Sequence, residues 1–584
     1  METILSILGS RLLAAVGDSG GVPVTVHAAA DARFGDYQSN VAMQLAKPRR
    51  ANPRQLAQEL IGRLDVADLC EPPEIAGAGF INFRLKPGTV ARHFTAMARD
   101  ERLGVPAVAP RRIVIDFSSP NVAKPMHVGH IRSTILGDAL ARIARFLGHT
   151  VIADNHIGDW GTQFGMLLIG WKAMLDSAAL ARDPIAELER VYKAQNERCK
   201  ADPAALEAAK AELVKLQAGD AENLAIWREM IRLSQVQFDA VYSRLGIHFD
   251  HAHGESFYNP WLRDVATDVL ARGIARESDG AICVFSDGSV PEKEDPFLIK
   301  DENGWKPAPA LIQKADGGAN YTTTDLATLD FRRREFAPDE VIYVTDGRQQ
   351  LHFRQLFAIW RRWHPEAPMK LSHVWFGSIL GEDGRPFKTR SGDTVKLAGL
   401  LDEAEDRALK VVKEKNPELP DAECREIARI VGLGAVKYAD LLPNRQGDYM
   451  FSWDRMLSFQ GNTAPYLQYS YVRIRSIFRK GDISESEIAG MQSATLTEPG
   501  EFALARKLAQ FGEVVPTILD DHRPNLLCNY LYELAGAFHS FFESCPVLKA
   551  AEPTRSSRLL LCDTTARVLR QGLGFLGIGV PERM

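Results

Sequence analysis

The sequence has few cysteines and does not group them. Its 584 residues include seven cysteines, which stand singly and form no CxxC pair or Cys/His cluster. A structural zinc site or a disulfide framework needs such groups, so we expect neither, and no other metal site can be assigned. No apolar run reaches membrane-spanning length, and residues 1–17 lack the layout of a secretory signal. We therefore expect a cytoplasmic protein without a membrane segment.

The sequence also lacks an excess of charge of either sign. Its 70 basic and 75 acidic side chains give a net charge of −5, and 45% of the residues are hydrophobic. This balance is typical of soluble globular proteins. A nucleic-acid surface would have to come from local basic patches, for example at residues 47–54 and 473–480. The length exceeds a single core and indicates several domains.

The most informative segment is SSPNVAKPMHVGH at residues 118–130. It follows an apolar run at residues 113–117 that suits a buried parallel strand, and it contains two prolines that exclude a helix. Residues 131–146 then show helical spacing, so His130 should lie at the start of a helix. Unpaired backbone N–H groups at such an end favour a phosphate.

The end of this segment suits ATP. Gly129 places no side chain where a flat base would approach, and His127 and His130 can face the same ligand. Two histidines at a helix start are often only capping or surface residues. Here the strand, the loop, Lys124 and Gly129 agree with one another, which favours the nucleotide site.

The segment resembles the signature of class I aminoacyl-tRNA synthetases, in the form with a preceding lysine that is typical of arginyl-tRNA synthetases. Further resemblances follow in the order of that family. They are FGDYQSN at 34–40, GFINFRL at 79–85, NHIGDWGTQFG at 155–165, YTTTDL at 321–326, QQLH at 349–352, GNTAPYLQY at 461–469 and GIGVPERM at 577–584. Because they cover nearly the whole chain, they are more specific than any single motif.

The resemblance implies three domains. They are an α+β N-terminal additional domain for tRNA corner recognition at 1–108, a Rossmann-type (HUP-like) parallel-sheet catalytic domain at 111–401, and an all-α, DALR-like anticodon-binding bundle at 402–584. Candidate strands at 151–153 and 341–344 flank a charged helical pair at about 176–244, so we expect an insertion at about 170–310. Without the resemblance, the N-terminal module could equally serve docking or oligomerisation.

The implied reaction joins L-arginine to its cognate tRNA. The arginine carboxylate attacks the α-phosphate of ATP, diphosphate leaves, and the arginyl group passes from the adenylate to the tRNA 3′ end. The resemblance implies ATP with Mg²⁺, L-arginine and tRNA(Arg) as substrates, a monomer, and activation that requires bound tRNA. We expect Mg²⁺ to be held largely by phosphate oxygens and water, without a dedicated metal site.

The resemblance also assigns the catalytic residues. His127 and His130 contact phosphates together with Gly129, and Lys124 contacts the α-phosphate. A full KMSKS loop is absent, and residues 384–392 read GRPFKTRSG in its place. Lys388 or Arg390 could reach the diphosphate, and the sequence leaves open which one does. In the family, Lys124 is thought to compensate for the missing loop lysine.

A pocket for arginine needs acidic partners. A guanidinium is planar, always charged and rich in donors, so a selective pocket requires at least one carboxylate and other fixed acceptors. Asp325 and Asp116 could supply carboxylates, although Asp325 alone could also be a helix-dipole partner and some relatives carry Glu at position 116. By resemblance the arginine-binding residues are Asp116, Ser119, Asn121, Tyr321, Asp325 and Gln349, with Ser119 and Asn121 at the α-amino and carboxylate ends.

Two other functions stay open on sequence alone. A small-molecule ligase of the same nucleotidyl-transferase superfamily would keep the signature, but it would not need a long helical C-terminal region. A catalytically silent RNA-binding relative would be expected to lose Lys124, His127 or His130, and all three are present.

Overall fold

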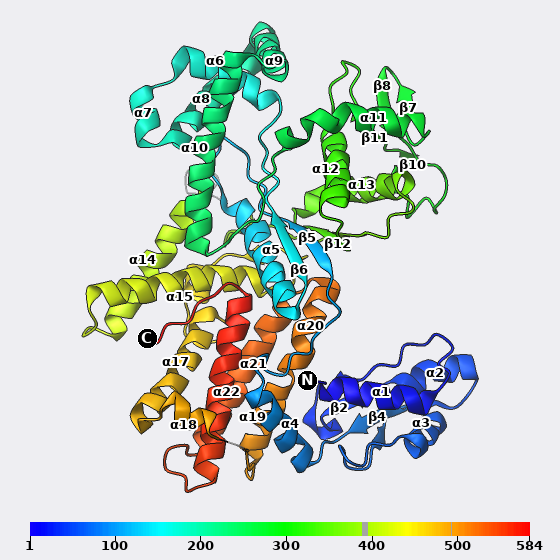
Figure 1. Ribbon diagram of the computed structural model, residues 1–584, viewed down its shortest axis with the longest axis vertical. Coiled ribbons are helices and arrows are strands. Elements are labelled where there is room, and N and C mark those ends of the chain that lie inside the picture. The colour runs from blue at the N-terminus through cyan, green and yellow to red at the C-terminus, as the bar shows by residue number, and fades with distance from the viewer. Residues whose placement is uncertain (388–394, 492) are drawn as a thin grey trace. The chain divides into compact units, whose positions relative to one another are not determined.

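The computed structural model describes residues 1–387, 395–491 and 493–584 (Figure 1). The chain divides into two compact units. One unit combines Met1–Val108 with Asn416–Leu419 and Leu457–Met584, and the other contains Ala109–Lys415 and Pro420–Met456. Among the described helices, none is both long and apolar enough to cross a membrane. All seven cysteines are buried thiols.

The second unit is built on a four-stranded parallel sheet with the strand order β13-β12-β5-β6. The strands are β5 (Arg112–Asp116), β6 (Thr150–Asp154), β12 (Glu340–Tyr343) and β13 (Lys370–His373). The two central strands carry continuous apolar runs and are buried on both faces, as parallel strands usually are. Asp116 and Tyr343 lie side by side in the register. The strands predicted at 113–117, 151–153 and 341–344 are confirmed, with ends shifted by a residue or two.

Helix α5 (Val128–Leu147) crosses from β5 to β6. The helix predicted at 131–146 is confirmed and begins already at Val128. The helix packs closely against Phe117, the residue after β5: a Cβ atom on Gly137 would lie 2.2 Å from the Phe117 ring. Only glycine fits at this position, so Gly137 allows α5 to lie this close to the end of β5.

The helices after β6 form a cluster of their own in Figure 1. They are α6 (Thr162–Met174), α7 (Ser177–Arg182), α8 (Pro184–Ala201), α9 (Pro203–Gln217) and α10 (Ala221–Leu245). The expected helical pair was therefore wrong, since α7 to α10 occupy that stretch. The Asp183-Pro184 and Asp202-Pro203 steps divide it, because each aspartate caps the next helix and each proline starts it.

A mixed region leads from this cluster back to the central sheet. It contains α11 (Leu262–Ala271), a three-stranded sheet of β7 (Arg276–Ser278), β8 (Ala281–Val284) and β11 (Ala310–Gln313), and the hairpin of β9 (Leu298–Asp301) and β10 (Gly304–Pro307). Helices α12 (Tyr321–Glu335) and α13 (Gln350–Trp363) follow. Leu326, Val341 and Trp360 belong to one buried apolar cluster that joins α12 and α13 to β12. The unit also contains the helices α14 (Leu397–Lys415), α15 (Asp421–Leu441) and α16 (Trp453–Met456) and the strand pair β14 (Ile379–Leu380) and β15 (Tyr449–Met450).

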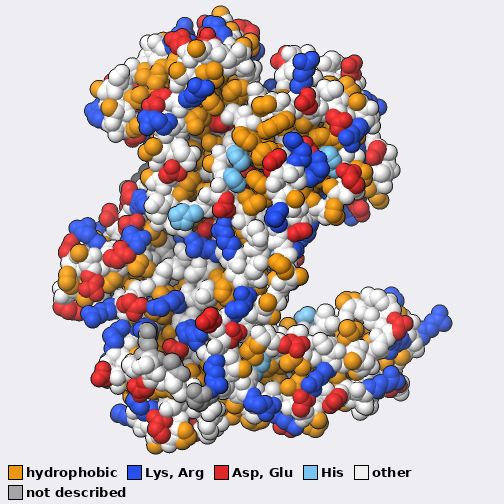
Figure 2. Space-filling model, viewed as in Figure 1, with side chains coloured by type: hydrophobic (Ala, Val, Ile, Leu, Met, Phe, Trp, Pro, Cys, Tyr) orange, Lys and Arg blue, Asp and Glu red, His pale blue; other side chains and the backbone are white. Residues whose placement is uncertain are grey.

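The first unit joins a small α+β module to a helical bundle. The module has the antiparallel sheet β1 (His27–Ala28), β2 (Tyr37–Ser39), β4 (Phe80–Phe83) and β3 (Glu74–Ala76), with α1 (Ile4–Val16), α2 (Val41–Arg49), α3 (Pro53–Arg63) and α4 (Pro87–Arg99). The main bundle helices are α17 (Ala464–Gly481), α19 (Pro499–Ala509), α20 (Phe511–Asp521), α21 (Asn525–Ser544) and α22 (Thr554–Phe575). On the face drawn in Figure 2, basic and acidic side chains are interspersed, in keeping with the balanced composition.

Candidate functional site

The loop between β5 and α5 has an unusual backbone. Ser118, Ser119 and Ala123 have φ angles of 76°, 49° and 60°, in the left-handed region that favours glycine. Such residues cost on the order of 1–3 kcal/mol each and persist only where their surroundings hold them. The strained positions therefore fall within the segment that the sequence singles out as the nucleotide site.

Buried side chains hold this backbone in place. The N–H of Ser118 donates to Ser133 Oγ at 2.8 Å, and the N–H of Ala123 donates to Ser234 Oγ at 2.9 Å. The N–H of Ser119 donates to Asn155 Oδ1 at 3.1 Å. Ser133 lies on α5 and Ser234 on α10, so the loop is fixed by the crossover helix and by the inserted helices.

The loop also meets the NHIGDWG segment directly. Asn121 and Gly158 form a parallel bridge, and Val122 N–H donates to the Gly158 carbonyl at 3.0 Å. A Cβ atom on Gly158 would lie 2.3 Å from Asn121 Oδ1. Asn121 is exposed and Ser119 is half-buried, so both predicted contacts for the ends of arginine are accessible.

The two signature histidines are fixed at the start of α5 by their own backbone. Gly129 N–H donates to His127 Nδ1 at 3.0 Å, and His127 N–H donates to His130 Nδ1 at 3.1 Å. Each Nδ1 is thus an acceptor, so each neutral ring carries its proton on Nε2. The ring centroids are 3.9 Å apart. Both rings therefore keep an N–H donor available for a ligand.

Both histidines are neutral at physiological pH. Burial lowers the pKa of His130 to about 3 and, together with Arg348 and Lys124, lowers the pKa of His127. The histidines can therefore serve a phosphate as hydrogen-bond donors and not as cations. Positive charge at this end must come from lysine or arginine side chains.

Lys124 is half-buried and lies against an inserted helix. Its Nζ is 4.5 Å from the ring centroid of Tyr192 on α8, which is a cation–π contact. Lys388 and Arg390, the two candidates for a loop cation, lie outside the described residues. On the far side of that segment, Val395 and Leu397 pair with the signature, since Val128 N–H donates to Val395 and Leu397 N–H to Met126, both at 2.9 Å.

Asp116 occupies a buried ion-pair cluster. Arg332 Nη2 is 2.6 Å from Asp116 Oδ2 and 2.8 Å from Asp154 Oδ2, and all three side chains are at most 5% exposed. The other Asp116 oxygen accepts from Ser119 Oγ at 3.3 Å. The structure thus places Asp116 between Ser119 and Arg332, whose guanidinium it shares with Asp154.

The sequence analysis missed Arg332. It lies on α12 with Tyr321 and Asp325, and the spacings of four and seven residues put all three side chains on one helix face. This periodicity is the signal that could have found it. Arg332 joins the helix that carries the predicted arginine pocket to the ends of β5 and β6.

The predicted arginine pocket is half-open. Tyr321 is 60% exposed at the start of α12, and Gln349 is exposed just before α13. Asp325 Oδ2 lies 2.5 Å from Nε2 of His352, whose ring meets the Tyr321 ring edge-on at 4.8 Å. The structure brings Tyr321 and Asp325 together around His352, a residue of the QQLH motif that we had not selected.

A further carboxylate near this pocket was also missed. Burial raises the pKa of Glu255 to about 7, and the neighbouring Asp325 and Asp159 add to this effect while His156 opposes it. Glu255 follows Gly254, where a Cβ atom would strike the Asp159 carboxylate at 2.4 Å. Mutually repelling carboxylates with a raised pKa are a common property of sites that receive a cation.

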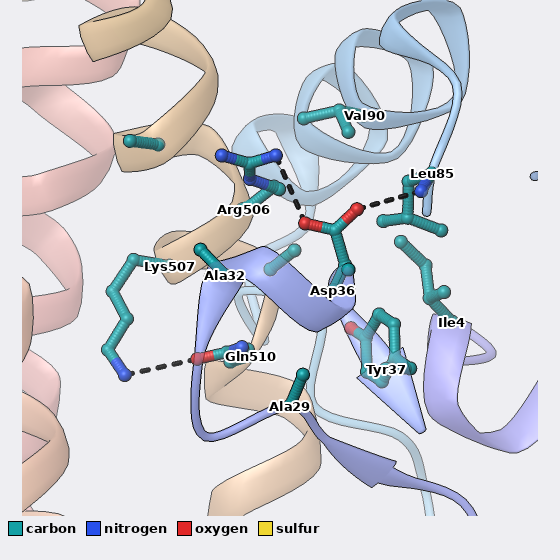
Figure 3. Close-up of a pocket in the computed structure, with 13 residues that line it drawn as sticks. Ile4, Ala29, Ala32, Asp36, Tyr37, Leu85, Val90, Arg506, Lys507 and Gln510 are labelled. Atoms are coloured by element: carbon teal, nitrogen blue, oxygen red, sulfur yellow. Dashed lines mark hydrogen bonds and ion pairs between the residues drawn. The ribbon is translucent and has the colours of Figure 1, made fainter. Parts of the chain in front are cut away.

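The FGDYQSN segment lies in the first unit beside a cavity of about 220 Å³ (Figure 3). Asp36 pairs with Arg506 at 3.0 Å and accepts from Leu85 N–H at 2.7 Å. Tyr37 donates to Glu513 at 2.8 Å, and burial raises the pKa of Glu513 to about 7. Asp36 and Tyr37 therefore bind the module to the helices α19 and α20 of its own unit.

Three family models match successive parts of the chain. Residues 3–85 match the arginyl tRNA synthetase N-terminal domain, and residues 94–453 match the catalytic domain of class I tRNA synthetases for arginine. Residues 467–584 match the DALR anticodon binding domain. The matches follow the order expected from the sequence resemblance.

Whole proteins are similar to the chain over its full length. The arginine–tRNA ligase of Synechococcus elongatus is 47% identical over 566 residues, covering 95% of this chain and 94% of the relative. That of Chromobacterium violaceum is 45% identical and covers 100% of both. The arginyl-tRNA synthetase structures from Plasmodium falciparum and Thermus thermophilus align with TM-scores of 0.83 and 0.82, at 27% and 26% identity, each covering 100% of both chains. The chain therefore belongs to the arginyl-tRNA synthetases, class I enzymes that ligate arginine to tRNA.

Proposed function

We propose that the β5–α5 loop binds the phosphates of ATP and that the facing ends of α12 and α13 bind the side chain of arginine. The observation that carries this assignment is the pair of neutral histidines whose Nδ1 atoms are occupied by backbone N–H groups. A pair fixed in this way presents Nε2–H donors without having to reorganise when the nucleotide binds.

At the phosphate end, His127 and His130 donate from Nε2 to phosphate oxygens. Lys124 leaves the Tyr192 ring to contact the α-phosphate as charge develops there. The exposed Gly129 leaves the start of α5 open for the nucleotide. Lys388 or Arg390 remains a candidate for the diphosphate contact. Fixed donors of this kind typically contribute roughly 100- to 1,000-fold each to a rate.

At the arginine end, Asp325 receives the guanidinium beside Tyr321 and Gln349. Asn121 and Ser119 hold the α-amino and carboxylate groups. Asp116 supports this end by orienting Ser119, to which it is hydrogen-bonded, while Arg332, which it shares with Asp154, is its ion-pair partner. The carboxylate of the bound arginine then attacks the α-phosphate, and the bond to the departing diphosphate breaks.

Mg²⁺ enters with ATP as part of the substrate. Among residues 1–387, 395–491 and 493–584, no group of three or more His, Cys, Asp or Glu side chains is arranged to hold a metal ion. Magnesium commonly keeps several waters and binds through nucleotide phosphates. When bound, it would neutralise charge on the phosphate oxygens.

The remaining parts of the assignment concern tRNA. We propose that the N-terminal domain, residues 1–108, recognises the tRNA corner and that the C-terminal helices, residues 402–584, bind the anticodon. The match of residues 3–85 to an arginyl N-terminal domain supports the first role, and the match of residues 467–584 to an anticodon binding domain supports the second over that part. The enzyme acts as a monomer in the cytoplasm and activates arginine only with tRNA bound.

Charging of total tRNA with labelled arginine tests the assignment. Wild-type enzyme should charge tRNA with arginine and not with lysine, and Lys124→Ala should lower the rate roughly 100- to 1,000-fold because the α-phosphate loses a cation. Exchange of diphosphate with ATP should appear only when tRNA is present. Equal rates for wild type and Lys124→Ala would remove Lys124 from the site, and exchange without tRNA would refute the requirement for it.

A further inference from the structure

A second lysine lies next to the signature, opposite His127. His127 and Lys396 form an antiparallel bridge, flanked by the hydrogen bonds from Val128 to Val395 and from Leu397 to Met126. His127 and Lys396 are therefore a non-hydrogen-bonded pair of an antiparallel ladder. In such a pair the Cα atoms are about 4.5 Å apart and both side chains leave the same face of the ladder.

An inserted helix holds Lys396 only loosely. Its Nζ is 3.4 Å from Glu189 Oε2 on α8, and the Lys396 side chain is 55% exposed. Glu189 has a nearer partner in Lys193, at 2.8 Å on the same helix. Exposed ion pairs are weak, and Glu189 would keep a counter-charge if Lys396 moved away. Lys396 is therefore able to change partners at little cost.

The same helix also contacts the other lysine of the phosphate end. Tyr192, which stacks on Lys124, lies three residues after Glu189 and therefore on the same face of α8. One helix face thus holds two lysines beside a pair of neutral histidines. Since the histidines carry no charge, these two lysines and Arg348, which also acts on the pKa of His127, are cations that the described residues offer to a triphosphate here.

We propose that Lys396 is a catalytic residue of arginine activation, supplying the positive charge that the departing diphosphate needs. When the arginine carboxylate oxygen bonds to the α-phosphorus, the bond from that phosphorus to the bridging oxygen of the diphosphate breaks. The electron pair leaves with the diphosphate, and the ammonium group of Lys396 neutralises this charge without transferring a proton. Glu189 holds Lys396 while ATP is absent. The inference rests on the proposed role of His127 at the phosphates.

Four variants separate this role from a structural one. Lys396→Ala should lower the rate of arginine activation on the order of 100-fold, as loss of one fixed donor typically does. Lys396→Arg should restore most of that rate, because a guanidinium also carries positive charge to phosphate. Lys200→Ala removes an exposed lysine of the same helix, which pairs with Glu197 and not with Glu189, and should leave the rate unchanged. Glu189→Gln should not lower the rate, since it only frees Lys396.

Lys396→Ala should slow the activation step and not the transfer step. Transfer of the arginyl group from preformed arginyl-adenylate to tRNA should be unchanged in Lys396→Ala, because the diphosphate has already left. Normal activation by Lys396→Ala, or an equal loss in Glu189→Gln, would overturn the proposal, the second result by showing that Lys396 only tethers α8. Failure of the wild-type enzyme to charge tRNA would instead refute the proposed assignment of the whole site.

Discussion

The two ends of the site are built on different principles. At the phosphate end, His127 and His130 are held by backbone N–H groups, and the loop before them is fixed by buried serine hydroxyls. At the arginine end, Tyr321 and Gln349 are exposed, and Asp325 is held by the side chain of His352. The phosphate end is therefore preformed, whereas the arginine end can rearrange when its ligand arrives.

The same contrast separates two aspartates that were both expected to bind arginine. Asp116 and Asp154 share the guanidinium of Arg332 and are almost fully buried. Asp325 is 19% exposed, and its partner is the neighbouring ring of His352. A buried carboxylate that already pairs with a guanidinium is less accessible to a second one. Asp325 should therefore dominate arginine binding, and Asp116 should dominate stability.

The largest effect should come from exchanging each of these aspartates for asparagine. Asp325→Asn removes a hydrogen bond to a charged group, about 1.5–3 kcal/mol, and should raise the KM for arginine roughly 10- to 100-fold with an unchanged thermal midpoint. Asp116→Asn breaks a buried pair, typically about 3–5 kcal/mol, and should lower the thermal midpoint clearly. Steady-state charging and thermal unfolding measure the two effects.

Asp325→Asn and Asp116→Asn are controls for each other, because each replaces a carboxylate by an amide, one at a half-buried position and the other at a buried one. The KM for ATP should stay near the wild-type value in Asp325→Asn. If Asp116→Asn alone raised the KM for arginine and kept full stability, the assignment of the two carboxylates would have to be reversed.

The preformed end is also the part that could be predicted from sequence. The apolar run of β5 and the helical spacing of α5 are local signals, and both elements were found. The arginine end depends on partners far apart in sequence, such as Arg332 and Asp116, which are separated by 216 residues. Nothing near either residue identifies its partner, so the pair of Asp116 and Arg332 could not be predicted. The inserted helices were counted wrongly because helical spacing is similar on both sides of Asp183-Pro184.

A smaller effect should follow from adding a methyl group at the preformed end. In Gly129→Ala, the new Cβ would lie 2.9 Å from two atoms of the His127 ring, so the ring must leave its hydrogen bond to residue 129. Loss of one such bond, about 0.5–1.5 kcal/mol, should raise the KM for ATP up to about tenfold. The KM for arginine should not change.

Gly399→Ala is the matched control for this substitution. Gly399 lies in the first turn of α14, and nothing lies within 4 Å of its added Cβ. Alanine is the better helix former, so this variant should keep its activity and be slightly more stable. Equal KM values for ATP in both variants would mean that the His127 ring is not held as tightly as its contacts indicate.

The smallest effect should be a difference in pH dependence between the two ends. Burial lowers the pKa of His130 to about 3 and also lowers the pKa of His127, so both rings are mainly neutral and the KM for ATP should change little between pH 6.5 and 7.5. Glu255 has a pKa raised to about 7, so it is partly protonated in this range. A guanidinium prefers the carboxylate form, so the proton must leave before arginine binds well. The KM for arginine should rise about threefold as the pH falls from 7.5 to 6.5, and Glu255→Gln should remove this slope.

A slope that persists in Glu255→Gln would place the titrating group elsewhere, and a matching slope in the KM for ATP would remove the distinction between the two ends.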